Sequence, residues 1–133
     1  MIYSTKTRYA IQALVGLANL KDAGYTTIEE LSEAAGIPKE FLAKIFQELS
    51  KHGLIKSKPG RGGGFKLNES PAKIELYKVV ELIDGPEPFS NCVFDGNRCH
   101  ANNPCPLHDE WVAVREKIVD FLKENTIADL SEK

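Results

Sequence analysis

The stretch that decides the fold lies at residues 38–66 and reads PKEFLAKIFQELSKHGLIKSKPGRGGGFK. Its first half, from about residue 38 to residue 51, predicts a helix because apolar residues recur on one side at helical spacing. These inward residues are Leu42, Ile45, Phe46 and Leu49. The outward side is small, polar or cationic and holds Lys39, Glu40, Ala43, Lys44, Gln47 and Lys51.

The second half of this stretch predicts a two-stranded wing. Residues 54–58 and 65–67 alternate apolar with basic residues on either side of a glycine-rich turn at 59–64. Such glycines can also form the phosphate-binding loop of a nucleotide-binding protein. Here, however, no Gly-Lys-Ser/Thr sequence follows them, and the surrounding pattern is not that of a βαβ unit. Lys58 and Arg61 near the tip are better suited to DNA phosphates or to the minor groove.

Two helices precede this stretch, and the second of them forms a helix-turn-helix with the 38–51 helix. Residues 4–22 predict a long helix capped by Ser4, and a short helix follows, capped by Thr26 or Thr27 and ended by Gly36. A short helix, a tight glycine turn and a helix with a polar-basic outer face are typical of DNA-binding proteins. An ordinary helical pair with a solvated face shares this pattern, and the wing that follows favours the DNA-binding interpretation. A further helix is predicted at 77–84.

A long helix is predicted at about 107–125. Its apolar residues have the spacing of a heptad seam and are Leu107, Trp111, Val114, Ile118 and Phe121. This stripe can pack on the protein's own core or on a second copy of the chain. A homodimer is favoured, because helix-turn-helix proteins commonly bind paired half-sites as two-fold dimers.

Composition points to an ordinary folded protein. The chain has 133 residues, 42% of them hydrophobic and 27% charged, so disorder and membrane insertion are disfavoured. The net charge of −2 hides an asymmetry: residues 39–66 hold seven basic and two acidic residues, which favours a polyphosphate partner. The N-terminus lacks the pattern of a secretory signal, so a cytoplasmic location is predicted.

Three cysteines fall within fourteen positions, at Cys92, Cys99 and Cys105, with the spacing C-x6-C-x5-C. An odd, clustered set favours a metal site over a disulfide framework. With His108 as fourth ligand, the set can hold zinc or a two-iron cluster, and His100 is a competing ligand. A cysteine-dependent enzyme needs a base and an orienting group near the thiol, which this spacing does not supply.

The chain resembles the IscR/NsrR family of winged-helix repressors. The resemblance rests on residues 3–10 (YSTKTRYA), on residues 31–54, on the wing sequence RGGGF at 61–65 and on the three-cysteine loop. It implies a homodimer that binds double-stranded promoter DNA under the control of an iron–sulfur cluster or a metabolite. It also implies that Lys6, Arg8 and the start of the 38–51 helix contact DNA. Phe41 lies at that start, and it fits equally well as a core aromatic residue.

The residues predicted to contact DNA are Lys6, Arg8, Lys39, Glu40, Phe41, Lys44, Gln47, Lys58 and Arg61. The first cysteine spacing departs from the family, whose cluster-binding members are expected to have five intervening residues where this chain has six. Some members have a carboxylate from the partner's first helix near the cluster, but the matching position here is Arg8, which cannot ligate. This favours His108 as ligand and [2Fe-2S] over [4Fe-4S].

The predicted organisation is therefore a winged helix-turn-helix at 1–84, a cluster-binding loop at 85–106, and a dimerisation helix with its tail at 107–133. An alternative retains the same fold and DNA binding. In it the cysteines hold zinc or act as redox thiols, and a partner protein or small molecule exerts control.

Overall fold

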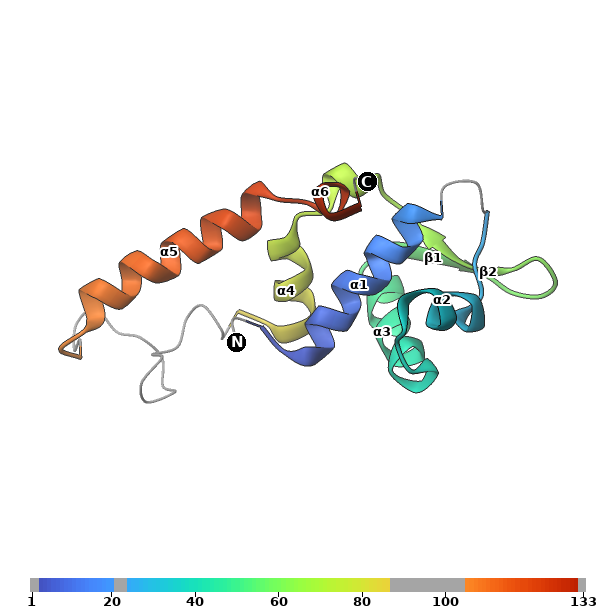
Figure 1. The fold of residues 1–133 in the computed structure, drawn as a ribbon, viewed down its shortest axis with the longest axis horizontal. Helices are drawn as coiled ribbons and strands as arrows, with labels where there is room; N and C mark the ends of the chain where they lie inside the picture. The colour runs from blue at the N-terminus through green and yellow to red at the C-terminus, as the bar shows by residue number, and fades with distance from the viewer. Residues whose placement is uncertain (1–2, 21–23, 87–104, 132–133) are drawn as a thin grey trace.

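The computed structural model describes residues 3–20, 24–86 and 105–131, and it is mainly α-helical with a small two-stranded sheet, as predicted. The elements follow in the order α1 (Thr5–Asn19), α2 (Ile28–Ala35), α3 (Lys39–Lys51), β1 (Ile55–Lys58), β2 (Gly64–Leu67), the 3₁₀ turn η1 (Pro71–Lys73), α4 (Leu76–Asp84), α5 (His108–Glu124) and α6 (Ile127–Ser131). Figure 1 shows α1, α2 and α3 gathered beside the sheet, while α5 extends away from them.

Helix α1 forms one wall of the core. Its N-terminus is capped as predicted, because the Ser4 hydroxyl accepts a hydrogen bond from the Thr7 backbone N–H at 3.1 Å. The helix ends at Asn19, earlier than the predicted residue 22, because the Leu20 backbone leaves the helical region at ψ 66°. The apolar residues that it buries are Ala10, Ile11, Ala13, Leu14 and Leu17.

The predicted helix-turn-helix is formed by α2 and α3. Thr27 is the residue that caps α2: its hydroxyl accepts from the Glu30 N–H at 3.1 Å, and the Glu30 carboxylate accepts from the Thr27 N–H at 2.9 Å. Gly36 ends α2 in the left-handed conformation, with φ +71°. The four predicted inward residues of α3 are all buried, so the periodicity of the 38–51 stretch identified the correct face.

The wing is an antiparallel pair in which Ile55 lies opposite Leu67 and Lys58 lies opposite Gly64. It is also joined to the segment that enters α2. The Thr26 N–H donates to the Phe65 carbonyl and the Phe65 N–H donates to the Thr26 carbonyl, each at 2.8 Å. This bridge fixes the wing beside the helix-turn-helix, and nothing in the local sequence pattern had indicated it.

The segment after α5 returns to the core as α6, where a tail had been predicted. Ile127 is fully buried, and its N–H donates to the Ile74 carbonyl at 2.9 Å. The Leu76 N–H donates to the Asn125 carbonyl at 3.0 Å, and α6 packs against α1 and η1. The core of the winged helix therefore extends beyond the predicted 1–84 unit.

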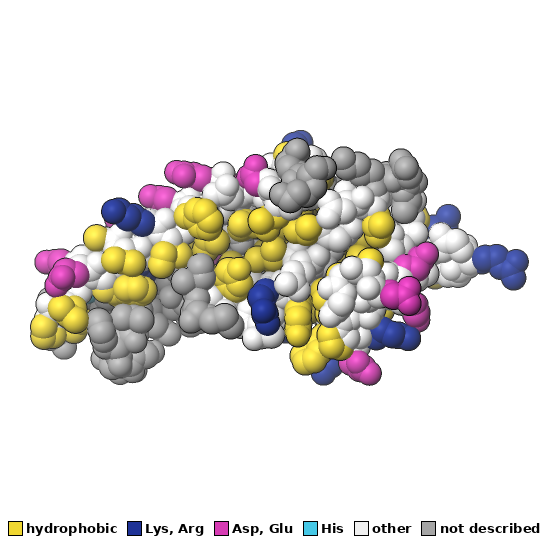
Figure 2. Space-filling view, viewed as in Figure 1, with side chains coloured by type: hydrophobic (Ala, Val, Ile, Leu, Met, Phe, Trp, Pro, Cys, Tyr) yellow, Lys and Arg dark blue, Asp and Glu magenta, His cyan; other side chains and the backbone are white. Residues whose placement is uncertain are grey.

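Helix α5 is close to its predicted bounds and is incompletely covered. Leu122 is its buried residue, and Ile118 packs partly against the core. Val114 and Phe121 remain 50% and 58% exposed. Figure 2 shows hydrophobic side chains in a band along α5 and toward the middle of the molecule. None of the helices in the described ranges is both long and apolar enough to cross a membrane.

Candidate nucleic-acid interface

The outward face of α3 is the centre of the candidate interface. Because α3 buries its apolar stripe, the predicted contact residues on the opposite side remain available to a ligand. Those that are exposed are Lys39, Glu40, Phe41, Lys44 and Gln47. The structure thus brings five of the predicted DNA-contacting residues together on one helix face.

Phe41 is not a core residue, which excludes one of its two predicted environments. Its side chain is 51% exposed, and its ring contacts that of Tyr9 on α1 with 5.6 Å between centroids. The Arg8 guanidinium lies 5.6 Å from the centre of the same Tyr9 ring. Arg8, Tyr9 and Phe41 therefore form a continuous surface that joins the start of α1 to the start of α3.

Two of the predicted basic residues already have acidic partners. The Lys6 ammonium lies 2.8 Å from a Glu48 carboxylate oxygen, and the Lys39 ammonium lies 3.4 Å from Glu29. A hydrogen bond from its own backbone N–H, and then the neighbouring Lys39, hold the pKa of Glu29 below its ordinary value. Exposed ion pairs of this kind are weak, so each lysine can leave its carboxylate and bind a phosphate instead.

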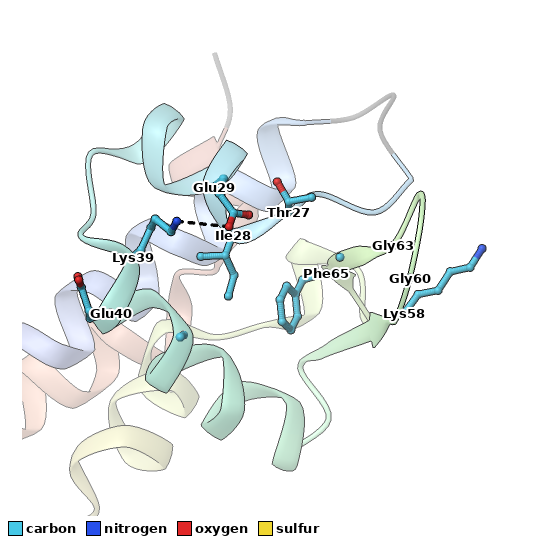
Figure 3. Close-up of a pocket in the computed structure, with 11 residues that line it drawn as sticks. Thr27, Ile28, Glu29, Lys39, Glu40, Lys58, Gly60, Gly63 and Phe65 are labelled. Carbon is cyan, nitrogen blue, oxygen red and sulfur yellow. Dashed lines mark ion pairs between the residues drawn. The ribbon is translucent and has the colours of Figure 1, made fainter.

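A groove of about 520 Å³ separates α3 from the wing. Figure 3 shows Glu29 and Lys39 on one side of it, the glycine-rich turn on the other, and the Phe65 ring between them. The Phe65 and Phe46 rings lie 4.5 Å apart between centroids, which packs β2 directly against α3. Phe65 had not been predicted as a site residue, although an aromatic residue directly after the glycines was the available signal.

The wing carries its basic residues at the tip and on its outer side. Arg61 lies in the turn closed by a 3.0 Å hydrogen bond from the Gly63 N–H to the Gly60 carbonyl, and it is exposed. Lys58 points away from the groove (Figure 3) and lies with its ammonium 5.8 Å from the centre of the Tyr25 ring. Within the described ranges, neither Lys44 nor Arg61 forms an ion pair.

Two of the four predicted cluster ligands can be placed, and they lie in one turn. The His108 N–H donates to the Cys105 carbonyl at 3.0 Å at the start of α5, and both residues are partly exposed. Cys92, Cys99 and the competing His100 lie outside the described residues. Among the described residues there is no group of three or more metal-ligating side chains. A thiolate and an imidazole are both donors that iron–sulfur and zinc sites use.

Comparison with known proteins identifies one family over almost the whole chain. The Rrf2 family, described as an iron-dependent transcriptional regulator, matches residues 3–133. A putative HTH-type transcriptional regulator of Aquifex aeolicus is 39% identical over 132 residues, which cover 98% of this chain and 91% of that protein. The HTH-type transcriptional regulator IscR of Escherichia coli is 29% identical, with 98% and 80% covered.

Solved structures show the same fold. The IscR of T. potens is 26% identical with a TM-score of 0.77, covering 96% of this chain and 83% of that one. CymR of B. subtilis, titled the global cysteine regulator, is 23% identical with a TM-score of 0.82, covering 96% and 94%. At that identity the likeness to CymR concerns the fold alone.

Proposed function

The chain belongs to the Rrf2 family of transcriptional regulators, and from this we propose that it is a homodimer whose binding to promoter DNA is controlled by an iron–sulfur cluster. The protein is a DNA-binding regulator and not an enzyme. The observation that carries the proposed DNA contacts is the exposed polar-basic face of α3 beside a wing fixed by Thr26 and Phe65. Such a helix enters the major groove while the wing reaches the adjacent backbone or minor groove.

Lys44→Ala and Arg61→Ala are each expected to weaken DNA binding while the dimer persists. The probe is the duplex that the wild-type protein selects from a random-sequence library, and the measurement is fluorescence anisotropy over a series of salt concentrations. Each lost phosphate contact makes the slope of log affinity against log salt shallower by about 0.9. The exposed Lys78→Ala on α4 is the control and should bind as the wild type does. Wild-type binding by both variants contradicts this assignment of the DNA-binding face.

The residues that would hold the cluster are Cys92, Cys99, Cys105 and His108. When bound, the cluster supplies a redox couple whose potential depends on its protein surroundings. The chain's own contribution is the position of the Cys105–His108 turn, which leads directly into α5. Because α5 continues to the buried Leu122 and then to α6 on α1, this turn is joined to the DNA-binding core by a continuous helix.

A second candidate retains the regulator but assigns the cysteines to zinc or to thiol redox chemistry. It is favoured by the partly exposed thiol of Cys105, which is free among the described residues. Metal content and colour separate the two candidates, because iron–sulfur proteins absorb visible light and zinc proteins do not.

Anaerobic reconstitution is expected to give a coloured wild-type protein containing iron and sulfide. Replacing Cys92, Cys99 or Cys105 by Ala should abolish the visible absorbance, since a thiolate ligand is lost. His108→Ala should leave a weaker or altered spectrum, because water can replace the imidazole. His52→Ala, at the exposed end of α3, is the control and should keep the wild-type spectrum. A colourless wild type with stoichiometric zinc would establish the second candidate instead.

A further inference from the structure

The start of α1 and the end of α4 are joined by two hydrogen bonds between residues that lie 80 positions apart in the chain. The Ser4 backbone N–H donates to one carboxylate oxygen of Asp84 at 2.9 Å, and the Ser4 hydroxyl donates to the other oxygen. Figure 1 shows these two helix ends side by side. The same Ser4 hydroxyl caps α1 by accepting from the Thr7 N–H. We call the pair of Ser4 and Asp84 the Ser4–Asp84 clamp.

The position of Asp84 is not explained by α4 itself. Asp84 is the last residue of α4, and a carboxylate at the C-terminal end of a helix opposes the helix dipole. At the N-terminal end of α1 the same charge is favourable, and hydrogen bonds to a charged acceptor are stronger than those between neutral groups. Among the described residues no lysine or arginine forms an ion pair with Asp84. The contact that stabilises this carboxylate is therefore the one with α1.

The first two turns of α1 are also attached to α3 at two points. The Lys6 ammonium lies 2.8 Å from the Glu48 carboxylate, and the Tyr9 ring contacts that of Phe41 with 5.6 Å between centroids. The Arg8 guanidinium lies against the same Tyr9 ring. The start of α1 therefore connects the end of α4 to the surface that faces DNA in the proposed function.

The clamp also lies at the beginning of the segment that carries the cysteines. Asp84 comes eight positions before Cys92, and Gly85 ends α4 with φ +80°. We propose that Asp84 is a positioning residue, which holds the start of α1 in its DNA-binding arrangement and makes the affinity for DNA depend on the segment that follows α4. The dependence on that segment rests on the proposed function. Helix α5 joins the far end of the segment to the core through α6, whereas the clamp joins its near end directly to the DNA-facing surface.

Two variants break the clamp and leave α1 with a capping side chain. Asp84→Ala removes the acceptor while Ser4 still caps the helix. Ser4→Asp retains a good N-cap but places two carboxylates together. Each variant should lower the affinity of the metal-free protein for the selected duplex by about tenfold, the effect of losing one such hydrogen bond. Amide hydrogen exchange of Thr7 and Arg8 should become faster, because the first turn of α1 opens more often.

A double variant, Ser4→Asp with Asp84→Ser, exchanges the two side chains. It restores a hydroxyl opposite a carboxylate with the same combined length and keeps a capping residue on α1. It should recover the wild-type affinity and exchange rates, which it would not do if each substitution acted by a separate loss of stability. Glu81→Ala is the control, because it removes a carboxylate from an exposed position on the same helix, and it should leave both measurements unchanged.

Dependence on the cysteine segment is measured on the same proteins after anaerobic reconstitution with iron and sulfide. The ratio of DNA affinities with and without the cluster should differ from one in the wild type, approach one in the two clamp variants and return in the double variant. The proposal is overturned if the clamp variants keep the wild-type affinity or the wild-type ratio, or if the double variant is as impaired as either single variant. A wild-type ratio of one contradicts the proposed function instead, and the affinities and exchange rates of the metal-free proteins then decide the positioning role of Asp84.

Discussion

Phe121→Asp is expected to convert the protein from a dimer into a monomer at micromolar concentration. Phe121 is the most exposed of the large hydrophobic residues in the described ranges, at 58%, and lies on the apolar stripe of α5. In a two-fold dimer the substitution places a carboxylate on both sides of an apolar seam, where an unpaired charge costs several kcal/mol. Light scattering gives the mass, and affinity for a duplex with two half-sites should fall by about 10²- to 10⁴-fold as the linked second contact is lost.

The matched control is Ala113→Asp, which adds one carboxylate to an exposed position on another side of α5. It should remain dimeric and bind both half-sites. Ile118, although on the predicted seam, is less suitable because it packs partly against the protein's own core. A dimeric Phe121→Asp variant, or a wild type that is already monomeric, would contradict an α5 interface.

Gly64→Ala is expected to lower the free energy of unfolding by about 3 kcal/mol and to abolish specific DNA binding. Gly64 has φ +134°, and a Cβ atom there would lie 2.4 Å from the Thr26 carbonyl oxygen. The Thr26 carbonyl cannot move away freely, since both the N–H and the carbonyl of Thr26 are hydrogen-bonded to Phe65, the residue after Gly64. The substitution therefore separates the wing from the segment entering α2. Denaturant unfolding measures the stability, and anisotropy measures the binding.

Gly24→Ala tests whether this effect is local. Apart from Gly24 itself and its chain neighbours, no described residue has an atom within 4 Å of a Cβ built at Gly24, so the variant should be as stable as the wild type and bind DNA equally. A Gly64→Ala protein with wild-type stability would show that the wing can shift without cost. The contact between Thr26 and β2 would then not be what holds the wing in place.

Local signals predicted the helix-turn-helix well. The capping box of Thr27 and Glu30 and the left-handed Gly36 depend on residues within a few positions of each other, so the sequence alone identifies them. The outward face of α3 was equally predictable, because helical periodicity separates it from Leu42, Ile45, Phe46 and Leu49. Lys39 and Lys44 therefore lie where the pattern placed them.

Features that depend on distant contacts were not predictable in this way. Thr26 pairs with Phe65 across the helix-turn-helix, and no periodicity links two segments so far apart. Phe41 is exposed and contacts Tyr9 on α1, and its spacing to Leu42 and Ile45 reveals neither. The assignment of Cys92, Cys99 and Cys105 as cluster ligands, with His108, remains a prediction, because only Cys105 and His108 lie in the described ranges.

A ribosome synthesising this chain makes α1, the helix-turn-helix and the wing long before it reaches Ile127. Domains commonly fold during synthesis, as soon as their sequence has emerged. Here the buried side of α1 is completed by α6, and Ile127 supplies both a core side chain and a backbone hydrogen bond to Ile74. The DNA-binding unit can therefore reach its full stability only after α5 has been made. A chain cut short before α6 therefore leaves the buried side of α1 incompletely covered.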